Sequence, residues 1–363
     1  MIKVISLFSG GGGLDLGFLT AGYKIIWAID NDPNAVETYR LNLGNHIICK
    51  DINDINIDEI PKADVVIGGP PCQSFSLAGK RNTEDSRGQL VWKYIEIIKK
   101  INPKAFVFEN VTGLLSAKNK NKESILENLK LAFKEIGYKI CQKVLNAADY
   151  GVPQKRRRVI IVGLKDSNFD FVFPAQTHCE DGIKYPKYIS VEEALGDLPI
   201  PNTIENSCIR YECQPQNDYQ VSMRKNSKGS VTDHIIPTTS KLDDFIIKHV
   251  KPGGNYMDIP KDVNSKRIQR LQEKGGHTTC YGRMRADLPA YTINTYFNRP
   301  NVGCNIHYKQ NRLITVREAL RLQSFPDNYI LRSTSKQGKH LIVGNAVPPL
   351  LAQIIAKELK KYL

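Results

Sequence analysis

A cysteine in a proline-stiffened loop is the residue of this 363-residue chain best placed for covalent chemistry. Cys72 follows Gly68-Gly-Pro-Pro, which leaves an apolar run typical of a buried strand. In doubly wound sheets, ligands bind at the carboxyl ends of the strands. A thiolate at such a place can act as a nucleophile, whereas an isolated free cysteine is more often buried and inert.

A glycine-rich turn and two acidic residues predict a nucleotide-like cofactor. The segment Phe8-Ser-Gly-Gly-Gly-Gly-Leu-Asp-Leu-Gly17 follows the first apolar run, and its glycines let the backbone approach a ligand at a helix start. Asp30 ends the second predicted strand and can accept hydrogen bonds from ribose hydroxyls, while Asp51 follows the third and can accept from an adenine amino group. Either acid could instead cap a helix, but the two in sequence favour adenosine.

The elements that must position these residues are short buried strands alternating with amphipathic helices. Apolar residues repeat at helical spacing over 90–101 and 125–136. This rhythm predicts an α/β, doubly wound, mostly parallel, Rossmann-like sheet with a second, smaller, irregular domain. The expected strands, which look parallel, are Lys3 to Phe8, Tyr23 to Ile29, Asp64 to Ile67, Ala105 to Phe108 and Val159 to Gly163.

The second domain is predicted where this rhythm fails. Its residues are rich in Asn, Pro, Gly and Thr, and Ser190-Val-Glu-Glu193 predicts one short capped helix. Thr315-Val-Arg-Glu318 predicts a second capped helix, and the chain closes with an amphipathic helix that the first domain's sheet must cover. We therefore expect domains at 1–166 and 167–311, with 312–363 returning to the first.

The charge of the chain is uneven. It has 51 Lys and Arg against 37 Asp and Glu, and residues 1–150 hold only 19 of these bases and 17 of the acids. The net charges are therefore +2 for that part and +12 for the remainder, which suggests that the C-terminal part meets a polyanion. The alternative is a charge excess that only promotes solubility.

Composition places the chain among soluble globular proteins. Hydrophobic residues make up 41%, and no apolar run approaches the roughly 20 residues that span a bilayer. The eight cysteines include no CxxC pair, and MIKVISLFSGG enters a strand directly, so we expect no signal peptide and a reduced, cytoplasmic setting. A monomer is the expected state because no dimerisation segment stands out.

Seven short blocks resemble, in their order, the DNA (cytosine-5)-methyltransferases of bacterial restriction-modification systems. The resemblance covers both flanks of the chain and not its middle. The blocks are Phe8-Ser-Gly-Gly-Gly, Asp51-Ile52, Pro70-Pro-Cys-Gln-Ser74, Phe108-Glu-Asn-Val111, Gln154-Lys-Arg-Arg-Arg158, Arg317-Glu-Ala-Leu-Arg-Leu-Gln-Ser-Phe-Pro-Asp327 and Gly344-Asn-Ala-Val-Pro348.

The resemblance implies methyl transfer from S-adenosylmethionine to carbon 5 of a cytosine flipped out of double-stranded DNA. It assigns Cys72 to covalent addition at carbon 6 and Glu109 to ring nitrogen 3. Arg156 and Arg158 would favour the Cys72 thiolate and hold the base, Arg158 at the cytosine carbonyl. The alternatives are a helix-capping acid at Glu109 and, most of all for Arg157, a solvated basic run or phosphate contact.

The remaining implied residues bind the cofactor or the DNA. Asn31 departs from the bulky aromatic residue of some members, so its stacking against adenine is in question. The residues expected at the cofactor are Phe8, Gly10, Gly12, Asp30, Asn31, Asp51, Ile52, Pro70, Leu90, Asn345 and Ala346.

DNA contacts are expected from two segments. Residues 73–87 would close over the base, with Gln73, Ser74 and Arg87 at the DNA, or form an ordinary surface loop. The resemblance makes residues 167–311 the target-recognition region. Its mixture of basic and aromatic residues favours DNA contacts by Arg283, Arg285 and Arg299, and the alternative is that these arginines belong to a basic scaffold.

Two residue pairs have the types and spacing of zinc ligands. They are His277-x-x-Cys280 and Cys304-x-x-His307. The resemblance aligns them with positions that bind no metal, so we expect no metal and interpret them as packing or DNA-facing residues, with a small zinc site as the alternative.

Other functions compete with the leading hypothesis. A tRNA cytosine-5 methyltransferase would use the same chemistry, but the large basic middle region favours duplex DNA. Cys72 and Glu109 argue against a non-catalytic DNA-binding regulator, and the glycine spacing argues against a dinucleotide enzyme. The target sequence stays open, as does pairing with a restriction endonuclease that acts on the same site.

Overall fold

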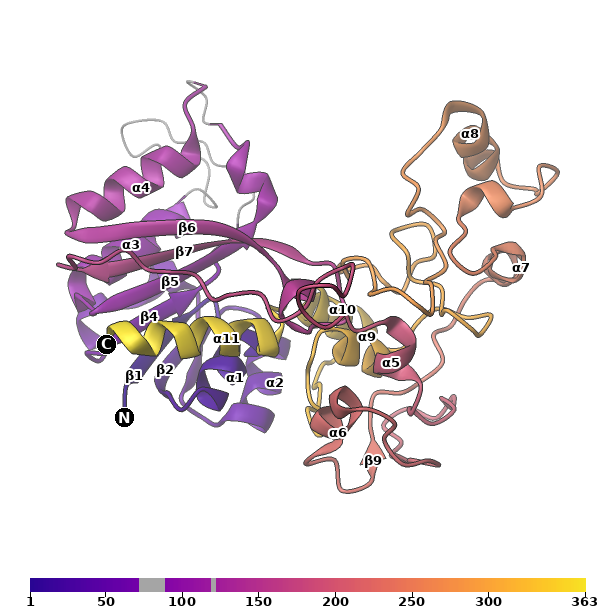
Figure 1. Cartoon of the computed structure of the whole chain (residues 1–363), viewed down its shortest axis with the longest axis horizontal. Coiled ribbons are helices and arrows are strands. Elements are labelled where there is room, and N and C mark those ends of the chain that lie inside the picture. The colour runs from indigo at the N-terminus through magenta and orange to yellow at the C-terminus, as the bar shows by residue number, and fades with distance from the viewer. Residues whose placement is uncertain (72–88, 119–121) are drawn as a thin grey trace. The chain divides into compact units, whose positions relative to one another are not determined.

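The computed structural model describes residues 1–71, 89–118 and 122–363, which form two compact units (Figure 1). Unit 1 comprises Met1–Asn146, Arg157–Ala175 and Pro349–Leu363, and unit 2 comprises Ala147–Arg156 and Gln176–Pro348. These units differ from the domains expected at 1–166 and 167–311, with 312–363 returning to the first, because 147–156 and 312–348 both belong to unit 2. The expected functional domains stay a prediction.

Unit 1 is built on a seven-stranded sheet of order β3-β2-β1-β4-β5-β7-β6. The first five strands in this order run parallel, and their interior residues are Val, Ile and Phe, as expected for strands covered on both faces. The strands are β1 (Lys3–Leu7), β2 (Lys24–Asp30), β3 (Ile47–Cys49), β4 (Val65–Gly68), β5 (Ala105–Val111), β6 (Tyr138–Asn146) and β7 (Arg157–Lys165).

One strand direction expected from the sequence is wrong. The run from Val159 to Gly163 lies within β7, which is antiparallel to both β5 and β6. The physical reason is the preceding strand β6, which the apolar pattern did not reveal because most of its residues are only partly buried. Antiparallel neighbours need no crossover helix, so β6 leads into β7 through residues 147–156.

Helices complete unit 1. Asp32 caps α2 with its side chain and Pro33 starts it, while the Ser124 hydroxyl caps α4. The apolar faces of α3 and α4 form one core with the sheet, in which Tyr94, Phe106 and Phe133 are fully buried. The helices are α1 (Gly13–Thr20), α2 (Pro33–Leu43), α3 (Gln89–Ile101), α4 (Ile125–Glu135) and α11 (Pro349–Leu359).

The last helix returns to the first part of the chain, as its apolar face predicts. Its main contact is with α1, and the Tyr23 hydroxyl donates to the Ala356 carbonyl at 2.9 Å. The covering surface for α11 is therefore largely a helix.

Unit 2 has little regular structure in the residues described. Both predicted capping boxes are confirmed, at Ser190 and Thr315. Four further helices and a two-stranded sheet were not expected. The elements are α5 (Val191–Leu195), β8 (Ile209–Arg210), α6 (Asp218–Arg224), β9 (Ser230–Val231), α7 (Lys241–His249), α8 (Lys266–Lys274), α9 (Val316–Leu322) and α10 (Lys336–Asn345).

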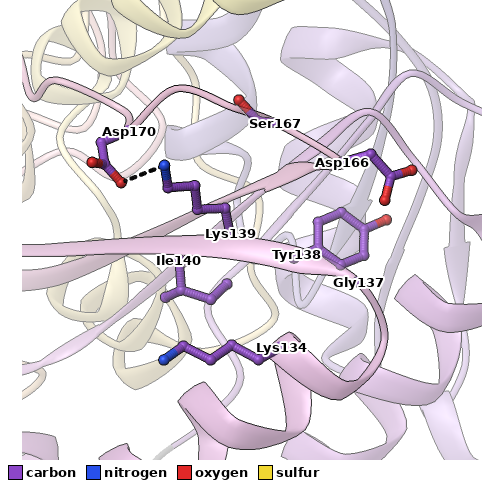
Figure 2. Close-up of a pocket in the computed structure, with 8 residues that line it drawn as sticks. All are labelled: Lys134, Gly137, Tyr138, Lys139, Ile140, Asp166, Ser167 and Asp170. Atoms are coloured by element: carbon purple, nitrogen blue, oxygen red, sulfur yellow. Dashed lines mark ion pairs between the residues drawn. The ribbon is translucent and has the colours of Figure 1, made fainter.

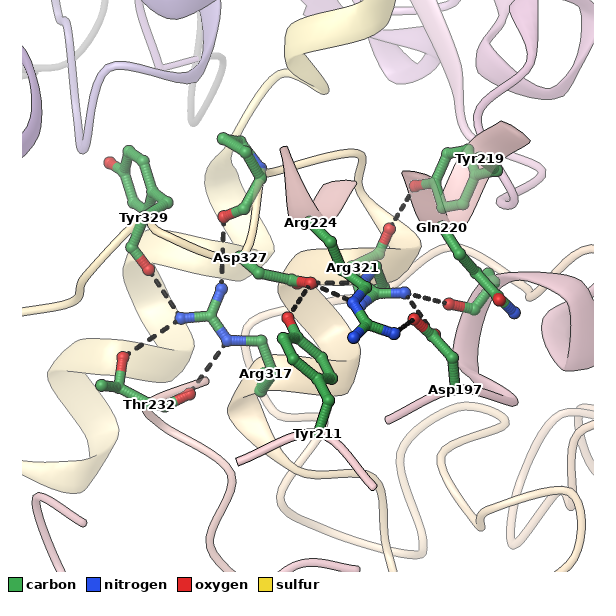
Figure 3. A network of polar contacts seen from close by, with 12 residues as sticks. Asp197, Tyr211, Tyr219, Gln220, Arg224, Thr232, Arg317, Arg321, Asp327 and Tyr329 are labelled. Carbon is green, nitrogen blue, oxygen red and sulfur yellow. Dashed lines mark hydrogen bonds and ion pairs between the residues drawn. The ribbon is translucent and has the colours of Figure 1, made fainter. Parts of the chain in front are cut away.

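Buried arginines of α9 hold much of unit 2 together (Figure 3). Arg321 pairs with both Asp197 and Asp327, and all three side chains are completely buried. Arg317 donates to the carbonyls of Thr232 at 2.9 Å and Tyr329 at 2.6 Å. Loops without a sheet leave many carbonyls unpaired, and a guanidinium with five N–H donors satisfies several of them at once.

Candidate active site

A carboxylate and a guanidinium meet in the carboxyl-terminal half of β5. Glu109 lies on β5 and Arg158 on β7, where the register pairs Val111 with Arg158 and so places the two side chains diagonally on one face. Arg158 Nε donates to Glu109 Oε1 at 2.9 Å, and the side chains are only 12% and 11% exposed. The pair was expected at one site, and the structure joins it directly.

The loop that leads to Cys72 is fixed beside this pair. A Cβ on Gly69 would lie 2.7 Å from Glu109 Oε2, so a larger residue at this position would displace the carboxylate. On the other face of β5, Asn110 Nδ2 donates to the Pro70 carbonyl at 2.9 Å and its Oδ1 accepts from the Val111 N–H. Pro70 is buried. Asn110 is thus a positioning residue that the sequence analysis missed, although it stands next to Glu109 in a matched block.

Four predicted site residues lie outside the described residues. They are Cys72, Gln73, Ser74 and Arg87. Their roles stay predictions.

The glycine-rich turn forms at the carboxyl end of β1, with Phe8 and Gly10 both at positive φ. The Gly10 N–H donates to Asp30 Oδ2 at 2.8 Å, and Asp30 Oδ1 accepts from the Asp32 N–H at 2.9 Å. Burial raises the pKa of Asp30 above its ordinary value. A Cβ on Gly10 would meet no atom within 4 Å, so there is open space beside the turn.

Gly12 is required by the packing beneath the turn. Its φ is +86°, and a Cβ would lie 2.3 Å from Leu43 and 2.9 Å from Tyr39. The Tyr39 hydroxyl donates to Asp15 Oδ1 at 2.9 Å, and the Ser6 hydroxyl donates to Oδ2 at 2.9 Å. Burial raises the pKa of Asp15 to about 6, because these hydrogen bonds only partly offset desolvation. The sequence analysis missed this buried acid.

The other expected cofactor residues of unit 1 also follow the carboxyl ends of parallel strands or begin the next helix. Asp51 accepts from the Asn53 N–H at 2.9 Å and caps a 3-10 turn, as its alternative interpretation allowed. Its neighbour Ile52 is buried in the core. Asn31 is exposed directly after β2, and Leu90 is partly buried at the start of α3.

Arg156 has a different environment from the one expected. It belongs to unit 2 and is fully buried. Its guanidinium donates to the carbonyls of Ile293 at 2.9 Å, Gly344 at 2.9 Å and Ala346 at 2.8 Å. Arg156 therefore fixes the segment of Asn345 and Ala346, of which Asn345 is exposed and Ala346 partly buried. Its expected catalytic role stays a prediction.

Of the four arginines expected at the DNA, the three that the structure describes have three different environments. Arg283 is only 4% exposed and donates to four main-chain carbonyls and to the Asn311 side chain, so its expected DNA contact is corrected to a structural role. Arg285 is exposed and pairs with Asp287 at 2.6 Å. Arg299 is exposed and lies over the Tyr296 ring at 4.8 Å.

Of the two histidine and cysteine pairs, Cys304 and His307 are buried in the protein. Cys304 is buried, which raises the pKa of its thiol to about 12. His307 Nδ1 accepts from the N–H groups of Lys309 and Gln310, and burial lowers its pKa to about 4. In the described part of the chain, no three His, Cys, Asp or Glu side chains form a group suited to a metal ion.

A hollow of about 530 Å³ lies at the opposite end of the sheet from Glu109 (Figure 2). Tyr138 and Lys139 line it where β6 begins, and the Lys139 ammonium pairs with Asp170 at 3.2 Å. The register pairs Lys139 with Leu164 and Leu164 with Ala105, the first residue of β5. The hollow is therefore separate from the candidate site.

The fold and site together define an α/β protein with a doubly wound sheet, which has a glycine-rich turn and acidic side chains at its carboxyl edge, where ligands bind in such folds. The chain belongs to the C-5 cytosine-specific DNA methylase family, whose model matches residues 2–361. It is accordingly a DNA cytosine-5 methyltransferase, with DNA as its substrate and a methyl donor as its co-substrate.

Named relatives match along nearly the whole chain. Type II methyltransferase M.DdeI of Desulfomicrobium norvegicum is 37% identical over 99% of this chain and 89% of its own. Type II methyltransferase M.FnuDI of Fusobacterium nucleatum is 36% identical over 100% and 95%.

Solved structures share the fold. A putative DNA modification methyltransferase encoded within an E. coli prophage has a TM-score of 0.76 at 25% identity, with 99% of both chains covered. The S. pombe Dnmt2 methyltransferase has a TM-score of 0.59 at 15% identity over 100% and 98% of the two chains, which shows the fold alone. Among the described residues, no helix is both long and apolar enough to cross a bilayer.

Proposed function

We propose that this enzyme transfers a methyl group from S-adenosylmethionine to carbon 5 of a cytosine that is flipped out of a specific short sequence in duplex DNA. The observation that carries the proposal is the Glu109–Arg158 pair, held beside the loop that leads to Cys72. We propose Cys72, Glu109, Arg156 and Arg158 as the catalytic residues.

The residues would divide the chemistry as follows. The Cys72 thiolate bonds to carbon 6, and the displaced electron pair reaches ring nitrogen 3, where Glu109 hydrogen-bonds or donates a proton. Arg158 donates to the carbonyl oxygen of the base and holds Glu109 in place. Carbon 5 then takes the methyl group, and the rest of the donor leaves as S-adenosylhomocysteine. Carbon 5 releases its proton to water, nitrogen 3 returns any proton to Glu109, and the Cys72–carbon 6 bond breaks, which restores the aromatic ring.

The turn at the end of β1 fits the proposed cofactor. The open space beside Gly10 admits a ligand against the backbone, and Asp30 and Asp51 offer carboxylate oxygens to ribose hydroxyls and an adenine amino group. When bound, S-adenosylmethionine supplies an electrophilic sulfonium methyl group. The residues of unit 1 that would line its site are Phe8, Gly12, Asn31, Ile52, Pro70 and Leu90. For Asn345 and Ala346 of unit 2, whose segment Arg156 holds, a cofactor role stays an expectation from the resemblance.

Base flipping is expected because the stack of a duplex hides carbons 5 and 6 of cytosine. The Type II names of the relatives support a role in bacterial restriction-modification, in the cytoplasm, with an endonuclease that cuts the same site. A monomer is sufficient, since each target base needs one active site.

An oligonucleotide duplex with 5-fluorocytosine at the target tests the chemistry. Fluorine cannot leave as a proton does, so the enzyme should stay covalently attached through Cys72. Bisulfite sequencing of methylated plasmid first identifies the target, and peptide mass spectrometry maps the adduct. An adduct on another side chain, or none despite turnover on normal DNA, would overturn the mechanism.

Two controls complete this test. Cys72→Ala should abolish methyl transfer and the adduct while keeping DNA binding. In a competition between plasmid and tRNA, label from the methyl donor should enter the plasmid, and entry into tRNA alone would favour the RNA-modifying alternative.

A further inference from the structure

Helix α8 in unit 2 has an apolar side and a strongly basic side. Its nine residues, KRIQRLQEK, include four bases and one acid. Ile268 is fully buried, and Leu271 packs against the same cluster. At 100° per residue the four bases fall within one third of the helix circumference, away from Ile268, and all four are exposed. The basic face of α8 consists of Lys266, Arg267, Arg270 and Lys274.

Polar contacts hold this helix firmly by its other side. Gln272 Nε2 donates to the Ile259 carbonyl at 2.7 Å and to the Tyr256 carbonyl at 3.2 Å. Gln269 donates to the Val263 carbonyl at 3.0 Å. The buried cluster also includes residues of α7, which lies at the same end of unit 2 (Figure 1). The basic face is therefore part of a packed element with a defined direction.

The charge pattern of α8 is unfavourable for an isolated helix. Lys266, Arg270 and Lys274 repeat at four-residue spacing, and like charges so placed destabilise a helix by about 0.2–0.5 kcal/mol a pair. Within the described residues, none of the four bases forms an ion pair. Arg267 instead contacts the side-chain amide of Asn301.

On helices of unit 1, some bases are paired with acids of the same helix. Arg40 pairs with Glu37 on α2, Lys93 with Glu96 on α3 and Lys130 with Glu127 on α4, each at a spacing of three residues. Helix α8 carries one acid at this spacing, Glu273, which stands three residues after Arg270, but no ion pair joins the two among the described residues. Four bases against one acid leave the helix with a net charge of +3, which points to an anionic partner outside the chain.

We propose that the basic face of α8 binds the phosphate backbone of duplex DNA. Lys266 to Lys274 span about 12 Å of helix, and a duplex carries one charge per roughly 1.7 Å of its axis, so the face can meet several phosphates. This inference rests on the proposed function. It also supplies a phosphate contact in the region where Arg283, buried in the fold, cannot.

A triple variant tests the inference. Lys266→Gln, Arg270→Gln and Lys274→Gln remove three charges and keep good helix formers, while Arg267 stays to preserve its contact with Asn301. The matched control is Lys62→Gln, Lys99→Gln and Lys357→Gln, which removes three exposed charges from unit 1. Dissociation constants for a duplex are measured by fluorescence anisotropy over a salt series, with methylation kinetics and thermal unfolding in parallel.

The α8 variant should bind about 100-fold more weakly at 0.15 M salt, and its salt slope should fall by about 2.7. The methylation rate at saturating DNA should stay within about twofold of wild type, and so should every value for the control. The single variant Arg270→Gln should lower the slope by about 1, which separates the effect from any folding defect.

Three outcomes would overturn the inference. One is a triple variant with the affinity and salt slope of wild type. Another is an equal loss in the control variant, which would mean that general charge is responsible. The third is weaker binding of tRNA with unchanged binding of the duplex, which would make RNA the partner. Failure of the proposed function is distinct, since wild type would then bind or methylate no plasmid.

Discussion

The two units supply hydrogen-bond partners to their main chains in different ways. This difference decides which polar side chains are available for chemistry and which support the fold. In unit 1 a seven-stranded sheet pairs the main chain, so Glu109 and Arg158 at its edge can pair with each other and act on a ligand. In unit 2 the described strands are two residues long, and the carbonyls of its loops are met by buried arginines such as Arg156 and Arg317. An arginine in an irregular region is therefore weak support for a DNA contact.

The largest effect should come from the edge of the sheet. Glu109→Gln keeps a hydrogen-bonding group but loses the acid, so kcat should fall by about 10²–10⁴-fold with little change in the melting temperature. Methylation kinetics and thermal unfolding measure the two quantities. Glu127→Gln, an exposed acid on α4, is the control. A large loss of stability with normal turnover would mean that Glu109 supports the fold and has no catalytic role, so the two units would not differ in this respect.

Arg321 in unit 2 should behave in the opposite manner. Arg321→Gln leaves Asp197 and Asp327 buried without their cation, which should lower the free energy of unfolding by about 3–5 kcal/mol. Lys361→Gln breaks the exposed pair with Glu358 and should change stability by less than about 1 kcal/mol. Chemical denaturation compares them. Equal effects would mean that burial does not distinguish these pairs.

A buried acid in each unit gives opposite pH dependence. Burial raises the pKa of Asp15 to about 6, so between about pH 4 and 6 the unfolded chain releases a proton that the folded chain keeps. The free energy of unfolding therefore falls as pH rises through this window, by about 3 kcal/mol in total. Asp15→Asn should lack this fall, as denaturation curves from pH 4 to 7 would record. Parallel curves for the two proteins would contradict it.

Glu318 is the buried acid of unit 2 whose pKa is lowered, in contrast to the raised pKa of Asp15 in unit 1. Burial works to raise its pKa, but hydrogen bonds and charge from Arg312 bring it to about 2. Its stabilisation is present above about pH 4.5 and is lost as pH falls toward 2.

The smallest effects on stability distinguish two arginines that stand two residues apart, Arg283 and Arg285. Arg283 donates to the Ile247 and Val250 carbonyls at the end of α7, so Arg283→Gln should cost about 2–3 kcal/mol of stability. Arg285 is fully exposed, and Arg285→Gln should leave the melting temperature unchanged. Thermal unfolding decides this. A stable Arg283→Gln variant with weakened DNA binding would restore the expectation from the sequence.

Local signals predicted most of unit 1. The apolar runs and helical spacing located the parallel strands β1, β2, β4 and β5 and the helices α3, α4 and α11. The capping boxes at Ser190 and Thr315 located two helices of unit 2. The three-residue strand β3 had no predicted range. Strand β6 and the antiparallel direction of β7 were missed because β6 is half-buried and has no clear period. Helices α6, α7, α8 and α10 were missed because each has ten residues or fewer, so its apolar residues do not complete a clear helical repeat.

The candidate site was predictable as a set of residues and not as a set of contacts. The matched blocks contain Glu109 and Arg158, which the structure pairs. They also contain Arg156, whose three carbonyl partners lie more than 130 residues away in the chain and leave no local trace. Burial against distant backbone is a tertiary property, so charge and spacing alone did not separate Arg156 and Arg283 from exposed arginines.

The bridge between Gln154 and Ala290 has a consequence for how such enzymes can change their target. Arg156 and Ile293 reinforce it, so the long stretch in between starts and finishes at one fastened point. The stretch contains β7 and helices α5 to α8, joined by loops. Doubling the length of one flexible loop adds only about 0.6 kcal/mol of closure entropy. Insertions in these loops are therefore thermodynamically cheap, provided that β7 and the fastening residues are kept.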